Sequence, residues 1–70
     1  MQREHIQSSM IDSVGYDPAS KTLEVEFTSG PIWEYWAVSP DMYNALMSAP
    51  SAGKYFLQNI RGKFQERQVG

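Results

Sequence analysis

The residues of this sequence best suited to chemistry are aromatic, basic and small polar ones. The candidate binding residues are Trp33, Tyr35, Trp36, Ser51, Gly53, Lys54, Tyr55, Arg61 and Lys63. Aromatic rings stack on unpaired nucleobases, and cations beside them attract phosphate groups, as in proteins that bind single-stranded nucleic acids. We therefore hypothesise a surface that binds RNA or tRNA. The alternative interpretation is that most of these aromatic side chains form the core of so small a domain.

The segment 51–54 suggests a second kind of contact. Ser51 and Gly53 begin a predicted helix, whose first backbone N–H groups favour an anion, and Lys54 adds a positive charge. The segment lacks the spacing of a glycine-rich phosphate loop. Alternatively, the small residues of this segment serve only to begin the helix.

Catalytic chemistry has little support. His5 is the only histidine and lies in the first residues of the chain. The carboxylates of Glu24, Glu26 and Glu34 resemble an acid–base pair or a hard-metal site in composition, but on an open sheet face water would screen them. We predict no enzyme, no metal site and no cofactor. The alternative function is a protein-interaction module, such as a phage or bacterial adaptor or inhibitor, that uses Trp36 and this acidic face to bind a protein partner.

Length, composition and charge narrow the class of protein. The 70 residues are 41% hydrophobic, enough for one folded domain that buries roughly 60% of its surface. The lack of cysteine and of any apolar run near the roughly 20 residues of a membrane span favours a cytoplasmic location without membrane insertion. The net charge of −2 opposes general polyanion binding, yet residues 51–70 hold four bases and one acid.

Hydrophobic periodicity predicts strands over residues 9–16, 22–28 and 32–38. In the middle strand apolar and polar residues alternate strictly. Turn-forming residues at 17–20 and 29–31 separate the three strands. In the third strand, alternation places Trp33 and Tyr35 on one face and Trp36 on the other. A bulge there would return the next apolar residue to the core; otherwise Trp36 stays partly exposed.

Two helices are predicted after the strands. Ser39 and Pro40 are typical of a helix start, so the first helix runs over 39–49, and Ser51 begins a second that extends to residue 61. The expected fold class is α+β, a three-stranded antiparallel β-meander followed by two short α-helices packed on one face (βββαα). The side chains expected to meet in the core are Leu23, Val25, Phe27, Leu46, Phe56 and Ile60. We expect the domain to span residues 8–64, between a flexible segment 1–7 and a flexible tail 65–70.

One set of residues resembles a known family. The set comprises Ser8-Ser9, Val14-Gly15-Tyr16-Asp17, Leu23-Glu24-Val25-Glu26-Phe27, Gly30, Trp33-Glu34-Tyr35, Val38, Ala49, Ser51, Gly53, Tyr55-Phe56 and Ile60-Arg61. Over residues 8–64 the chain resembles the KTSC family, which is named for a segment at the C-terminus of some lysyl-tRNA synthetases and also occurs as free-standing bacterial and phage proteins. The family's central Tyr-x-Tyr corresponds to Trp33-Glu34-Tyr35, so stacking is retained but one phenol hydroxyl is lost.

The resemblance implies a small domain for which RNA binding is suggested by the synthetase association. It implies functional roles for residues that match the family pattern, namely Trp33, Tyr35, Ser51, Gly53, Tyr55 and Arg61. Each also has a purely structural interpretation. Tyr35 would then pack under the second helix, and Gly53 would allow a close approach of that helix.

Overall fold

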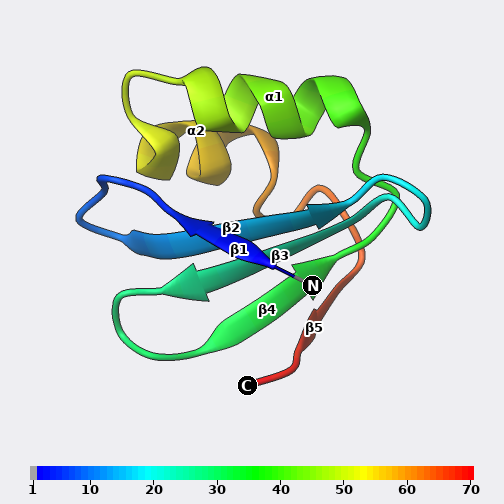
Figure 1. Cartoon of the computed structure of the whole chain (residues 1–70), viewed down its shortest axis with the longest axis horizontal. Coiled ribbons are helices and arrows are strands. Elements are labelled where there is room, and N and C mark those ends of the chain that lie inside the picture. The colour runs from blue at the N-terminus through cyan, green and yellow to red at the C-terminus, as the bar shows by residue number, and fades with distance from the viewer. Residues whose placement is uncertain (1) are drawn as a thin grey trace.

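An antiparallel sheet with two helices across one face makes up residues 2–70, the part of the chain described by the computed structural model (Figure 1). The strands lie side by side in chain order: β1 Arg3–His5, β2 Ile11–Asp17, β3 Thr22–Phe27, β4 Ile32–Tyr35 and β5 Glu66–Gln68. The helices are α1 Pro40–Ser48 and α2 Ala52–Asn59. Because both helices precede β5, the chain leaves the sheet after β4, covers one face and returns to add the last strand.

The predicted α+β class is confirmed, but the predicted three-stranded sheet is wrong, since the sheet has five strands. The additional strands are the two outer ones, β1 and β5, and they come from the segments for which flexibility was expected. Each is only three residues long and mostly exposed. Such strands have no apolar alternation of their own and exist because a neighbouring strand offers backbone partners, which local sequence patterns do not reveal.

The helix starts agree with the sequence prediction. The Ser39 side chain accepts a hydrogen bond from the backbone N–H of Met42 at 3.2 Å, and Pro40 occupies the first helical position. The Ser51 side chain accepts one from the backbone N–H of Lys54 at 3.3 Å. Both serines thus supply partners for N–H groups that the helix cannot satisfy internally.

The core lies between the helices and the inner face of the sheet. Leu23 and Val25 of β3 are fully buried there, as are Leu46 of α1 and Ile60 just after α2. Phe56 of α2 is also buried. The predicted sealing of one sheet face by the helices is therefore confirmed, and burial of these apolar side chains is the main force that holds the two layers together.

The end of β4 shows how the chain passes from sheet to helix. Ala37 has a left-handed backbone with φ 62°, and Val38 after it is fully buried. The Val38 N–H donates to the Lys21 carbonyl at 3.0 Å. The left-handed residue Ala37 thus returns Val38 to the core, as one of the two alternatives for this stretch predicted, and Trp36 is half-buried. The strand itself ends at Tyr35, short of the predicted residue 38, because the chain turns out of the sheet at Ala37.

No helix within residues 2–70 is both long enough and apolar enough to cross a membrane.

Candidate functional site

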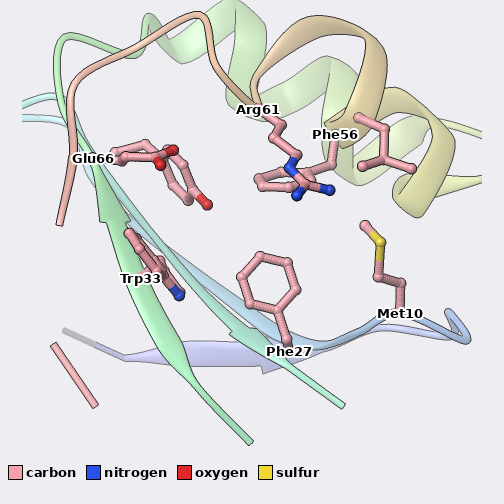
Figure 2. Close-up of a pocket in the computed structure, with 8 residues that line it drawn as sticks. Met10, Phe27, Trp33, Phe56, Arg61 and Glu66 are labelled. Carbon is pink, nitrogen blue, oxygen red and sulfur yellow. The ribbon is translucent and has the colours of Figure 1, made fainter. Parts of the chain in front are cut away.

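A pocket of about 340 Å³ lies between α2 and the inner face of the sheet (Figure 2). Its lining consists of four aromatic rings, two apolar side chains and two charged ones: Phe27, Trp33, Tyr35, Phe56, Met10, Leu57, Arg61 and Glu66. The pocket is therefore an apolar recess that carries one group of each charge.

The aromatic rings gather because strand periodicity and helix packing direct them to the same place. Trp33 and Tyr35 are two residues apart on β4 and so project from the same face of the sheet. Phe27 ends the neighbouring strand, β3. Phe56 reaches down from α2 and meets Phe27 and Tyr35 edge to face, each with a ring-centroid distance of 5.3 Å. These contacts hold the three rings in a fixed arrangement at the base of the pocket, since edge-to-face aromatic pairs add stabilising free energy beyond that of burial.

Tyr35 brings a hydroxyl group to this apolar site. The residue is only 3% exposed, and within residues 2–70 no buried side-chain oxygen lacks a hydrogen-bond partner, so the Tyr35 hydroxyl, which forms no hydrogen bond there, reaches the open space of the pocket. The pKa of Tyr35 is raised to about 12, mainly by burial and to a lesser extent by the Glu66 carboxylate, while the Arg61 guanidinium partly offsets the rise. The hydroxyl therefore keeps its proton at neutral pH and can donate a hydrogen bond to a bound molecule.

Arg61 places a positive charge at the pocket. Figure 2 shows its side chain reaching in from the helix side, whereas Glu66 comes from β5 at the edge of the sheet. Within residues 2–70 the ion pairs involve only Arg3 and His5 as cations, so the exposed Arg61 guanidinium forms none. A guanidinium in this state can bind a phosphate or carboxylate with two hydrogen bonds.

A second pocket of about 420 Å³ lies next to the first, at the start of α2. The predicted residues Ser51, Gly53 and Lys54 line it, and it shares Met10 and Leu57 with the first pocket. A Cβ atom at Gly53 would lie 3.6 Å from the Met10 Cβ, an ordinary contact. The glycine is therefore not required for a close approach of the helix, contrary to the structural interpretation above.

The remaining predicted residues line neither pocket. The Tyr55 hydroxyl donates to the Met42 sulfur at 3.0 Å and so joins the two helices. The Trp36 backbone N–H donates to the Gln65 carbonyl at 3.0 Å, while its side chain is half-buried. Lys63 is exposed beyond α2. The structure thus brings Trp33, Tyr35 and Arg61 together and places the other candidates elsewhere.

Several pocket residues were not among the candidates. Phe27 and Phe56 were expected only as core residues, and Met10, Leu57 and Glu66 were not singled out at all. For Glu66 no local signal exists, because it reaches the pocket only through the pairing of β5 with β4, where it is the direct partner of Tyr35.

The acidic outer face of the sheet is organised by β1. The Arg3 guanidinium forms an ion pair with Glu24 and lies 3.9 Å from the Glu26 carboxylate. Ser13 is buried between them, where it accepts from Arg3 at 3.0 Å and donates to Glu26 at 2.9 Å. The expectation of carboxylates exposed to water is therefore wrong for Glu24 and Glu26, which Arg3 partly neutralises. In the described chain no three potential metal ligands come together.

Comparison with known proteins identifies the family. The sequence model of the KTSC domain matches residues 7–64. The chain belongs to the KTSC family. A crystal structure of a KTSC domain protein from Yersinia pestis is similar to this KTSC domain with a TM-score of 0.93 at 40% identity, over 99% of this chain and 97% of that one. The resemblance seen in the sequence is thereby confirmed.

Relatives of this KTSC domain occur in two settings. An uncharacterised protein of Stutzerimonas stutzeri is 48% identical over 58 residues, which cover 83% of this chain and 82% of that protein. A lysine–tRNA ligase of Nostoc punctiforme is 38% identical over 63 residues, which cover 90% of this chain but 11% of the ligase. A second such ligase, from a Nostoc species, is 40% identical with the same coverage. The domain therefore corresponds to a small part of these ligases and to most of the shorter relative.

Proposed function

We propose that this KTSC domain is a non-catalytic RNA-binding domain that takes one unpaired nucleotide into the pocket between α2 and the sheet. The observation that carries the proposal is the placement of the Arg61 guanidinium, which forms no ion pair among residues 2–70, beside a pocket floored by aromatic rings. A base can stack on Trp33 or Phe27 while its phosphate contacts Arg61. Stacking of this kind is tolerant of sequence and is worth about 1–3 kcal/mol per base.

Two further observations support the choice of RNA. Lys54 lines the adjoining pocket, which shares Met10 and Leu57 with the first, so a second positive charge lies near the aromatic recess. Relatives of the domain are part of proteins named as lysine–tRNA ligases. The net charge of −2 opposes phosphate binding elsewhere on the surface, so we expect a small footprint with a shallow dependence on salt.

The alternative is a protein-interaction module that uses Trp36 and the acidic outer face. This alternative has less support, because Trp36 is half-buried and the carboxylates of Glu24 and Glu26 already form ion pairs with Arg3. A partner would have to displace these ion pairs or bind beside them.

The RNA proposal is tested by fluorescence anisotropy with a dye-labelled short oligouridine at low and near-physiological salt. The Arg61→Gln variant should weaken binding about tenfold, since one charge-assisted contact to phosphate is lost. Arg67→Gln is the matched control: it removes the same charge from an exposed residue of β5 that lines neither pocket near α2.

Two results would contradict the proposal. The first is no binding by the unmodified domain even at low salt. The second is equal weakening by Arg61→Gln and Arg67→Gln, which would show that only net charge matters and that the pocket plays no part.

A further inference from the structure

Two polar side chains, Tyr35 and Glu66, stand next to each other at one end of the aromatic pocket. They are direct partners in the register of β4 and β5, so their Cβ atoms are about 4.5–5.5 Å apart on the same face of the sheet. In Figure 2 Glu66 lies at the end of the pocket away from Met10. Within residues 2–70, neither the Tyr35 hydroxyl nor the Glu66 carboxylate has a hydrogen-bond or ion-pair partner among the side chains.

The two groups differ in hydrogen-bonding character. The Tyr35 hydroxyl retains its proton well above neutral pH, because burial and the neighbouring Glu66 carboxylate raise its pKa to about 12. It is therefore available as a donor. The Glu66 carboxylate offers two acceptor oxygens and, when ionised, no donor. The end of the pocket thus presents one donor beside a pair of acceptors.

This pattern complements one base only. The Watson–Crick edge of guanine carries an acceptor, O6, followed by two adjacent donors, the N1–H and the 2-amino group. Adenine, cytosine and uracil lack two adjacent donors, so each leaves a carboxylate oxygen facing an acceptor or nothing. A base that leaves these polar groups unpaired binds less tightly, so the pattern favours guanine over the other three bases.

We propose that the pocket selects guanine, with both Glu66 oxygens accepting from the N1–H and 2-amino groups and the Tyr35 hydroxyl donating to O6. The inference rests on the proposed RNA-binding function and adds base specificity to it. The stacking residues lie within the segment 7–64 that matches the family, whereas Glu66 lies beyond it on β5. Base selection therefore requires the C-terminal strand in addition to Tyr35, whereas stacking depends only on the part of the domain that matches the family.

The experiment compares short oligouridines that carry a single guanosine, inosine, adenosine or cytidine at the centre, each titrated by anisotropy. The guanosine strand should bind about tenfold more tightly than the adenosine, cytidine and all-uridine strands. This factor lies in the lower part of the range of discrimination that one bidentate base contact provides. Inosine differs from guanosine only in the missing 2-amino group and should lose most of this preference.

The decisive variant is Glu66→Gln, which replaces one acceptor oxygen by a donor amide and should bring all strands within about twofold of each other. Glu34→Gln is the matched control, since Glu34 lies between Trp33 and Tyr35 on β4 and projects from the opposite face; it should keep the preference. Far-UV circular dichroism verifies that both variants are folded.

The outcomes separate this inference from the function on which it rests. Equal binding of all strands by the unmodified domain would overturn guanine selection and leave RNA binding intact. A preference that survives Glu66→Gln, or an inosine strand that binds as well as the guanosine strand, would overturn the role of the carboxylate. Failure of every strand to bind would overturn the proposed function itself.

Discussion

Replacement of Tyr35 by phenylalanine should make the stability of the domain less sensitive to alkaline pH. The pKa of Tyr35 rises from 10.0 to about 12 in the folded protein, chiefly through burial. As pH increases, the unfolded chain loses this proton first, so unfolding becomes progressively more favourable between the two values. Each pKa unit is worth about 1.4 kcal/mol, so the loss is about 1.4 kcal/mol at about pH 11 and about 2.7 kcal/mol once both states are ionised. Phenylalanine has no proton to lose and should escape this loss.

The measurement is urea-induced unfolding followed by tryptophan fluorescence, for both proteins at neutral pH and at about pH 11. Burial also raises the pKa values of Tyr16 and Tyr43, but these residues are present in both proteins and cancel in the comparison. The unmodified domain should lose about 1.4 kcal/mol more than Tyr35→Phe. Equal losses in the two proteins would show that the surroundings of Tyr35 do not raise its pKa, and the burial of this residue described above would be refuted.

Two further predictions concern stability. Phe56→Ala removes the buried ring that meets Phe27 and Tyr35, and it should cost about 3–5 kcal/mol, measured by urea unfolding; a loss under about 1 kcal/mol would contradict the packing. Gly53→Ala should stabilise the domain by about 0.5 kcal/mol, because alanine favours the helix and its Cβ meets only ordinary contacts, whereas Gly62→Ala should destabilise it by about 1 kcal/mol at φ 74°. Thermal melts of the two variants that shift in the same direction would disprove this contrast.

The local sequence predicted those features that are set within a single strand or helix. The alternation at Leu23 and Val25 predicted which face of β3 is buried, and the serines at 39 and 51 predicted where both helices begin. The two-residue spacing of Trp33 and Tyr35 likewise placed them on one face of β4. These predictions succeeded because strand periodicity and helix capping depend on residues close together in the chain.

The outer strands and the set of residues around the pocket depend instead on contacts between segments that are distant in the sequence. β1 and β5 are exposed three-residue strands that exist through backbone pairing, and local patterns do not encode the partner. The pairing of β1 brings Arg3 to Glu24, and the pairing of β5 brings Glu66 to Tyr35. Tertiary structure decided these two contacts, because a side chain on an edge strand acquires its neighbours only when a strand distant in sequence has docked beside it. By itself, the sequence determined the class of fold, the helix starts and the placement of Trp33 and Tyr35 on one face of β4. The grouping of Arg61 and Glu66 around Tyr35 was decided only when α2 packed on the sheet and β5 paired with β4, because both charged residues lie far from Tyr35 in the chain.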